Sequence, residues 1–197
     1  MTLGLAKGQV QVVPYDPAWA EDFATERQEV LRILAELRPA PTIEHIGSTA
    51  IPGLAAKPII DIAIGFPARA QVSKGLRLLK AAGRDYVKAA NQPGMLFMAL
   101  GDPRRFHYHL VALGTPAWGK LITFRNYLRR HPVVAAEYAV MKQTLAQKFP
   151  DSRFDYMRFK RPLLRAILQR SYAEARRRRF AVAVRQALAV AEFESGG

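Results

Sequence analysis

A Gly-Ser-Thr turn and a single aspartate shortly after it are the residues whose types and spacing best suit phosphate chemistry. Gly47, Ser48 and Thr49 follow a short apolar run. Glycine allows tight backbone geometry, and the two hydroxyls with the neighbouring backbone N–H groups can bind an anion. Asp61 lies within residues 59–64, a β-branched run typical of a buried strand. A carboxylate there is costly unless it is paired, hydrogen-bonded or metal-bound, so we expect function at this position.

A purely structural explanation of these residues stays open. Ser48 and Thr49 could cap a short helix, and Asp61 could accept hydrogen bonds from backbone N–H groups. Side chains of a strand alternate between its two faces, so the isoleucines at even positions of 59–64 share one face. Asp61 and Ala63 share the other face.

The H-x-H sequence of His107 and His109 is a second polar feature. Both imidazoles point to one face if residues 105–113 form a strand. Neutral imidazoles in this array can bind a divalent metal or transfer protons, and a facing carboxylate would complete a partial triad. They could equally hydrogen-bond a phosphate or pack on the surface. We favour a site that faces Asp61.

Several basic side chains are placed to meet an anion at that site. Lys57 precedes the acidic strand, and Arg105 precedes the histidines. Arg125 and Arg129 are four residues apart and lie on one face of a predicted helix. Alternatively, these two arginines solubilise the helix or pair with acids such as Glu137.

The elements that must position these side chains alternate between strand and helix patterns. Strands are predicted at 9–13, 43–47, 59–64, 86–87, 95–100 and 105–113. Apolar spacing and capping residues predict helices at 16–37, 68–82, 118–130, 132–149 and 153–170, with a further helical tail to 193. This pattern predicts an α/β (α+β) fold, a mixed β-sheet covered by helices with a helical C-terminal half.

Length and composition favour one domain at 1–173, with 174–197 as its basic helical C-terminal extension. The chain has 197 residues and a hydrophobic content of 50%, enough for a substantial core. No apolar run approaches the roughly 18 to 20 residues that span a bilayer, and no signal-peptide pattern opens the chain. We therefore expect a cytoplasmic protein with no membrane partner. The absence of cysteine excludes disulfides and thiolate metal sites.

The charge favours anionic partners. The net charge is +14 and the pI is near 10.5, which suits nucleotides, phosphorylated metabolites or nucleic acid. Part of the excess lies in four consecutive arginines at 176–179. These could contact nucleic acid, but a solvated helix face is the favoured interpretation. The oligomeric state stays open, because the apolar helix at 181–191 could pack on its own domain or on a second copy.

The residues around the turn closely resemble the GrpB family, whose members carry a similar GST-x-x-PGL-x-x-KPIIDI stretch. Other matching segments are VVPYDPAW (12–19), RRFHYHLV (104–111), FRNYLRRHP (124–132) and EYAVMKQTLAQKF (137–149). The resemblance covers about 10–171 and implies a nucleotidyltransferase-like fold. It also places Tyr156 and Lys160 in the family's late Tyr-x-x-x-Lys pattern, at a spacing that an ordinary amphipathic helix would also show. Lys142, in the same region, lies beside an apolar stripe, where its stem can pack while its amine reaches a groove or solvent.

The nucleotidyltransferase resemblance implies a Gly-Ser turn that holds triphosphate and strand carboxylates that bind two divalent ions. Gly47 and Ser48 match the turn, and Asp61 matches the first acid. Ala63 occupies the second acid position, and residues 106–113 contain no acid. Because alanine cannot bind Mg²⁺, this departure argues against standard two-metal transfer. If His107 and His109 replace the acids, Mn²⁺ or Zn²⁺ fits better than Mg²⁺.

Three functions are consistent with these observations. The first is an atypical transferase for a nucleotide or phosphorylated metabolite, in which Asp61 binds metal or acts as a base. The second is a non-catalytic nucleotide- or metabolite-binding module that lost the second acid. The third, ranked last, is a nucleic-acid-associated protein that uses the basic tail. Whether the protein is an enzyme, and which acceptor it would use, stay open at this point.

Overall fold

The main predicted strands form one mixed sheet of five strands, in the order β1-β2-β5-β4-β3. The computed structural model describes residues 3–195, without the side chains of residues 179, 181 and 183–195. The strands are β1 (Thr42–Ile46), β2 (Ile60–Phe66), β3 (Asp85–Tyr86), β4 (Met95–Leu100) and β5 (Phe106–Ala112). β2 and β5 pair in parallel, and the other neighbours pair antiparallel. The predicted mixed sheet is therefore confirmed.

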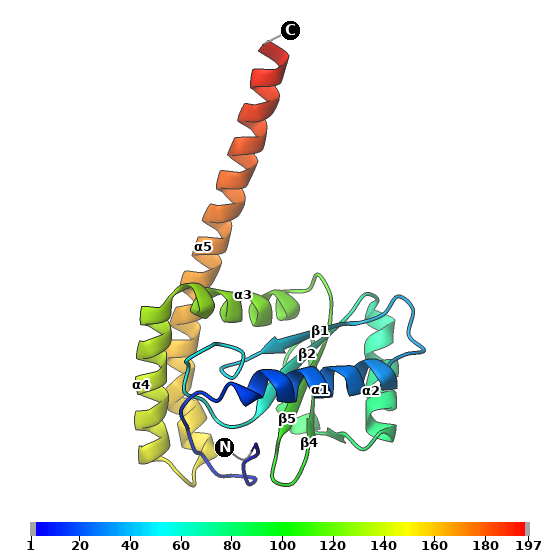
Figure 1. Cartoon of the computed structure of the whole chain (residues 1–197), viewed down its shortest axis with the longest axis vertical. Helices are drawn as coiled ribbons and strands as arrows, with labels where there is room; N and C mark the ends of the chain where they lie inside the picture. Colours follow the sequence, from blue (N-terminus) through cyan, green and yellow to red (C-terminus); the bar gives the residue numbers. More distant parts are fainter. Residues whose placement is uncertain (1–2, 196–197) are drawn as a thin grey trace.

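Helices cover the sheet and make up most of the second half of the chain. They are α1 (Ala18–Ile33), α2 (Arg69–Ala81), the short 3₁₀ helix η1 (Lys88–Ala90), α3 (Pro116–Arg130), α4 (Pro132–Lys148) and α5 (Arg153–Ser195). Figure 1 shows the first part of α5 beside α4, while the rest of this helix extends away from the body of the molecule. The predicted helical C-terminal half is confirmed.

The main core lies between one face of the sheet and the helices α1 and α2. Ile60, Ile62 and Ile64 of β2 are fully buried in this core, as the alternation of the strand predicts. Val30 of α1 and Leu79 of α2 pack against them. The opposite face of β2 therefore carries Asp61 and Ala63, away from the main core.

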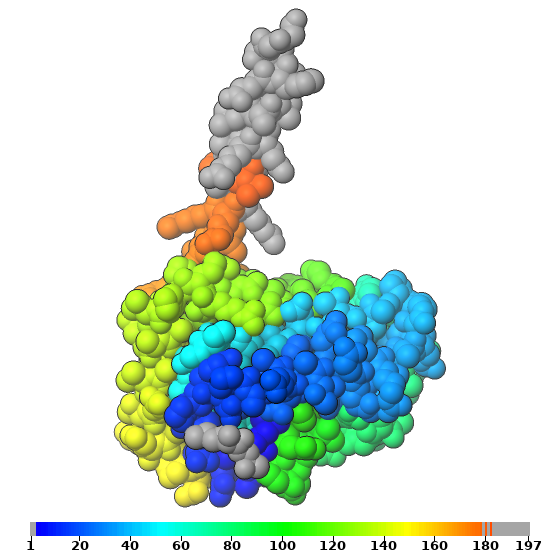
Figure 2. Space-filling view, in the orientation of Figure 1, coloured from blue at the N-terminus to red at the C-terminus, as the bar shows by residue number. Residues whose placement is uncertain are grey.

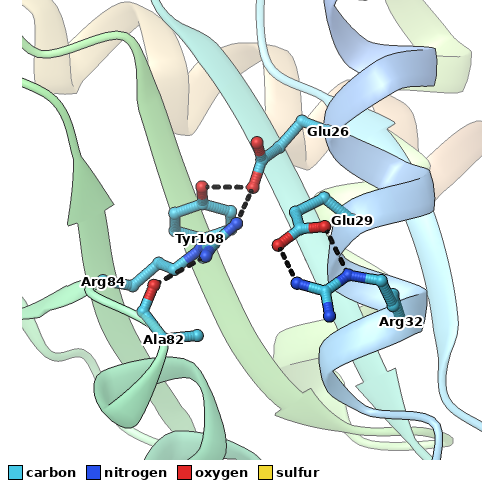
Figure 3. A network of polar contacts seen from close by, with 6 residues as sticks. All are labelled: Glu26, Glu29, Arg32, Ala82, Arg84 and Tyr108. Carbon is cyan, nitrogen blue, oxygen red and sulfur yellow. Dashed lines mark hydrogen bonds and ion pairs between the residues drawn. The ribbon is translucent and has the colours of Figure 1, made fainter.

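A buried polar network ties α1 to β5 within the core face (Figure 3). Glu26 Oε1 accepts hydrogen bonds from Arg84 Nη2 and from the Tyr108 hydroxyl, each at 2.7 Å. Burial, with the charge of Glu26, raises the pKa of Tyr108 and keeps the phenol protonated. Because Tyr108 lies between the two histidines on β5, the network fixes the strand from behind while they face the opposite side. The nearby Glu29–Arg32 pair lies on the exposed side of α1.

The N-terminal segment lies along the junction of α4 and α5. Val10 N donates to Pro150 O at 2.7 Å, and Val10 packs with Ala146 and Tyr156 in a small buried cluster. Figure 2 shows the dark blue N-terminal segment directly against the yellow surface at this junction. The segment thus helps to fix the start of α5, including Tyr156.

Some predicted elements differ from the structure. Residues 9–13 form no strand, because Val13 makes only an isolated bridge to Ala56. The helix expected over 16–37 is α1, which ends at Ile33; Asp16 Oδ1 accepts from Ala18 N at 3.0 Å at its start. The two helices expected after residue 153 are one helix, α5, with Pro162 inside it.

In the part of the chain that the structure describes, no helix has the length and apolar character needed to cross a membrane. Our expectation for the packing of 181–191 falls almost entirely on side chains outside the described residues.

Candidate functional site

Asp61 is hydrogen-bonded to both histidines of the H-x-H sequence. In the parallel pairing of β2 and β5, Asp61 lies beside His107 and Ala63 beside His109. His107 Nδ1 and His109 Nε2 lie 3.3 and 3.2 Å from the same atom, Asp61 Oδ1. An ionised carboxylate can only accept, so these two ring nitrogens carry the protons. His107 Nε2 and His109 Nδ1 are left as acceptors when both rings are neutral.

These contacts keep the Asp61 carboxylate charged. Burial opposes its ionisation, but the hydrogen bonds and charges of the two histidines outweigh burial and hold the pKa of Asp61 well below its usual range. Phe97 of β4 packs against both rings, with centroid distances of 4.9 and 5.3 Å. His109 Nδ1 is buried without a partner among the described residues. His107 keeps 18% of its side chain exposed, so it is the better placed of the two to meet a ligand.

The Gly47 turn lies directly against Asp61. β1 and β2 pair so that Ile46 is opposite Asp61, and Gly47 follows with a φ of 72°. A Cβ atom at Gly47 would lie 2.5 Å from Asp61 Oδ2. Glycine is therefore required both for the left-handed backbone and for the close approach of the carboxylate.

The two hydroxyl residues of the turn have different surroundings. Ser48 is half-buried, and its carbonyl accepts a hydrogen bond from Ile51 N at 3.2 Å. Thr49 is buried, with Oγ1 3.0 Å from His45 Nε2. Burial lowers the pKa of His45 to about 4, so this pair is neutral near pH 7. The structure thus engages Thr49 inside the protein and leaves Ser48 as the hydroxyl closer to the surface.

Lys57, Lys142 and Lys160, which we call the lysine cluster, gather around two tyrosine rings. Lys57 Nζ lies 4.4 Å from the centroid of Tyr156, and Lys142 Nζ lies 4.6 Å from that of Tyr138. Lys160 Nζ is 5.5 Å from both centroids. Among the residues that the structure describes, no carboxylate lies within the 4.0 Å of a salt bridge to any of the three amines. The loop before β2 and the helices α4 and α5 thus bring together three lysine amines without an acid partner. Two of them, those of Lys57 and Lys160, are cations near pH 7.

The electrostatics of the lysine cluster favour an anion. Burial, then the charges of Lys160 and Arg153, lowers the pKa of Lys57 to about 8. Burial, with the charge of Lys160, lowers the pKa of Lys142 to about 6; its amine donates to Ala55 O and is almost fully buried. The charge of Asp61 acts on both Lys57 and Lys160, which places the cluster within electrostatic range of the carboxylate. Half-buried Lys57 and Lys160 can meet a ligand, with Lys142 behind them.

The predicted arginines stabilise the turn or lie elsewhere. Arg125 Nη1 donates to Glu44 Oε2 at 2.6 Å and to His45 O at 2.9 Å, so its acid partner is Glu44. Arg129 Nε and Nη2 both donate to the carbonyl of Ala50, at 2.9 and 2.7 Å. Arg105 is exposed and packs 5.7 Å from the Phe106 ring rather than against Asp61. Arg125 and Arg129 are therefore engaged by the protein itself, and half-buried Lys57 and Lys160 are the predicted cations better placed for a ligand.

Glu44 is the residue near the site that the sequence interpretation missed. In the antiparallel pairing of β1 and β2, Glu44 lies directly opposite Ala63. Directly opposed residues point to the same face of a sheet, so Glu44 shares the face of Asp61. The sequence places Glu44 just before the Gly47 turn, which indicates that it lies near the site. The strand register that sets Glu44 opposite Ala63 could not be predicted from the sequence. Within the described residues, no group of three or more His, Asp or Glu side chains is arranged to hold a metal ion.

Residues 9–170 match the sequence model of the family described as GrpB protein. UPF0157 protein PA4798 of Pseudomonas aeruginosa is 35% identical, over 85% of this chain and 70% of that protein. The Glutamate-rich protein GrpB of Alkalihalophilus pseudofirmus is 33% identical, over 84% of this chain and 98% of that protein.

Solved structures agree with this similarity. The crystal structure of the conserved protein GrpB from Enterococcus faecalis is 33% identical, with a TM-score of 0.71 over 82% of this chain and 99% of that chain. A mutant of the Cid1 poly(U) polymerase bound to MgATP is 10% identical, with a TM-score of 0.50 over 68% of this chain and 44% of that chain. The second similarity concerns the fold alone, and the predicted nucleotidyltransferase-like fold is confirmed.

Proposed function

This chain belongs to the GrpB family, and from that premise we propose that it binds a nucleotide or another phosphorylated metabolite as an atypical nucleotidyltransferase-like protein. The observation that carries the proposal is the lysine cluster, whose amines have no carboxylate partner among the described residues. Its two charged members, Lys57 and Lys160, lie within electrostatic range of Asp61. Buried or half-buried cations that repel one another are relieved by a polyanion. A solved structure of the same fold, the Cid1 poly(U) polymerase, is bound to MgATP, which supports a nucleotide as the ligand class.

The ligand would lie between the Gly47 turn and the lysine cluster. The turn and Ser48 offer backbone N–H groups and a hydroxyl, and Lys57 and Lys160 offer ammonium groups to the phosphates. Phosphates at this position would lie next to the imidazole of His107. This arrangement supports group transfer rather than binding alone.

His107 would act as the general base of the transfer. Its Nε2 takes the proton of an acceptor hydroxyl while the acceptor oxygen attacks phosphorus. The bond from phosphorus to the leaving phosphate breaks, and the negative charge that develops on that phosphate lies beside Lys57 and Lys160. Asp61 holds the tautomer of His107 through Nδ1 and stabilises the imidazolium that forms.

The second candidate is a binding module that performs no transfer. Two observations favour it: Ala63 cannot supply the second acid, and Glu44 opposite it is ion-paired with Arg125. Such a module would keep the glycine turn and the lysine cluster but would not turn over any acceptor.

Thermal-shift screening of ATP, GTP, CTP, UTP and coenzyme A tests the binding. A ligand at about 100 times its Kd should stabilise the fold by about 2.7 kcal/mol, a shift of a few degrees in Tm. The Lys57→Gln and Lys160→Gln variants should lose most of the shift. Lys74→Gln, which removes an exposed lysine paired with Glu36, is the matched control and should keep it. If none of these ligands shifts the Tm, the proposal is wrong.

Turnover separates the two candidates. With a bound nucleotide and a panel of hydroxyl acceptors, a transferase should lose product formation in His107→Gln while retaining the ligand-induced shift. Binding by the wild-type protein without turnover of any acceptor favours the binding module.

A further inference from the structure

We infer that this anion site takes the metal-free polyphosphate, and that Lys57 and Lys160 supply the positive charge that a divalent ion would bring. The inference rests on the proposed function and specifies the form of its ligand. Nucleotidyltransferase-like sites are expected to hold divalent ions, but the residues present here do not fit one.

One of the two oxygens of Asp61 is already engaged by the histidines. Oδ1 already accepts hydrogen bonds from His107 Nδ1 and His109 Nε2. Oδ2 faces Gly47, and it is the one carboxylate oxygen of Asp61 left for a ligand, which is too few for a divalent ion that prefers several oxygens. The protons on the two histidine nitrogens face the carboxylate, so those nitrogens cannot bind a metal beside it without losing these hydrogen bonds.

The other side chains that could coordinate a metal ion are missing or already engaged. Ala63 is fully buried and offers no oxygen. Glu44 lies opposite Ala63, but Arg125 Nη1 donates to its Oε2 at 2.6 Å, and Arg125 is itself only 8% exposed. Asp61 and Glu44 are thus both paired with donors of the chain itself.

The charge around the face is positive rather than negative. Arg125 balances the charge of Glu44. Asp61 is then the one remaining carboxylate, and it acts electrostatically on two lysines, Lys57 and Lys160. A bound divalent cation would add two positive charges near lysines that already repel one another. A polyphosphate brings several negative charges to the same place, so the anion without a metal is the complementary ligand.

Isothermal titration calorimetry of the full chain with inorganic tripolyphosphate, in EDTA and in excess MgCl₂, tests the inference. We expect binding in EDTA, and weaker binding in MgCl₂ because the ion complexes the free anion. Binding that requires Mg²⁺, or that is tighter with it, overturns the inference while the proposed function stands. No binding of tripolyphosphate or ATP under either condition overturns both.

Asp61→Asn gives an independent readout. Removing a negative charge beside a metal-free polyanion should leave its affinity unchanged or increase it, whereas removing a metal ligand should abolish binding. Lys57→Gln should weaken binding in EDTA about tenfold or more, because it removes a charge-assisted contact. Lys74→Gln should change it little. Mn²⁺ binding can be followed by NMR, because the paramagnetic ion broadens the signals of nearby residues. Broadening of signals around the site in the wild-type protein that is absent in Asp61→Asn would overturn the inference without any measurement of activity.

Discussion

Gly47 is the single residue on which the geometry of the site depends most closely. Gly47→Ala should destabilise the fold by about 2–3 kcal/mol, because it adds both left-handed backbone strain and a contact with Asp61 Oδ2 at 2.5 Å. The displaced carboxylate should also disturb the histidines. The measurements are urea denaturation and NMR of the imidazole groups, in which the resonances of His107 and His109 should move.

Gly53→Ala is the matched control for Gly47→Ala. Gly53 has nearly the same φ, 75°, but nothing lies within 4 Å of an added Cβ. It should therefore cost only the backbone strain, about 1–2 kcal/mol, and leave the histidines unchanged. Equal effects of the two substitutions on the imidazole resonances would contradict the role assigned to the close contact.

Lys142 should make the stability of the protein depend on pH. Its pKa is about 6 in the folded protein and near 10.5 in the unfolded chain, so the unfolded chain binds the extra proton between these values. The free energy of unfolding should then rise with pH across this window, and the cost of burying the charged amine should be complete below about pH 6.

Lys142→Met tests this pH dependence. The Tm of the variant minus the Tm of the wild-type protein should be larger at pH 6 than at pH 9, because only the wild-type protein must bury a charged amine at the lower pH. Lys148→Met, at an exposed position of the same helix, should retain the wild-type pH slope. The same slope in the Lys142 variant as in the wild-type protein would show that this amine is charged in the folded state throughout the range.

At the scale of elements, close packing between helix and sheet distinguishes two helical glycines. Gly75 of α2 lies against fully buried Phe66, and a Cβ there would be 2.4 Å from the ring. Gly119 of α3 has nothing within 4 Å of an added Cβ. Gly75→Ala should therefore destabilise the fold by about 1–3 kcal/mol through overpacking, despite the better helix propensity of alanine.

Gly119→Ala should instead stabilise the fold by about 0.5–1 kcal/mol, because only propensity changes. Both effects can be measured by chemical denaturation with a common m-value. A destabilising Gly119→Ala would mean that α3 needs flexibility or space at this position that the structure does not show.

The elements themselves followed from sequence where the pattern was local. The alternation of β2 and β5 was enough to put Asp61 on one face and both histidines on one face, since the period of a strand is two. Their meeting required the parallel pairing of the two strands, which no local pattern reports. The strand expected at 9–13 failed because its backbone partners, Ala56 and Pro150, come from distant segments that no local pattern reports.

The cations of the site show the same limit. Arg125 and Arg129 have the correct helical spacing, but tertiary contacts direct them to Glu44 and to the carbonyl of Ala50. The lysine cluster joins a loop and two helices. Its members could be suspected individually from sequence, but the sharing of two tyrosine rings depends on how α4 packs on α5.

For the whole molecule, part of the net charge of +14 lies at the candidate site and part lies along the end of α5 that extends from the body. We propose that residues 1–173 contain the ligand site and that 174–197 is an extension of the same domain. Glu174 marks the boundary, because it pairs with Arg130 and His131 at the junction of α3 and α4. Arg176, Arg177 and Arg178 beyond it are exposed.

Two truncations separate the roles of the extension. A chain that ends at Ala175 loses the arginines at 176–179 but keeps Glu174. A chain that ends at Ala173 also loses Glu174, and should be about 0.5–1 kcal/mol less stable than the longer truncation, because Arg130 and His131 lose a largely surface partner. Both chains should bind tripolyphosphate as the full chain does, since Lys57, Lys142 and Lys160 are present in each.

Nucleic acid binding gives the contrasting outcome for the same two chains. If the arginine run contacts nucleic acid, the full chain should bind it with a steep salt dependence, and both truncations should lose that binding together. Salt-sensitive binding that persists in the chain ending at Ala173 would place the nucleic acid on the body of the protein. In that case the lysine cluster would be a candidate contact for a nucleic acid backbone, and Lys57→Gln should weaken nucleic acid and tripolyphosphate binding in parallel.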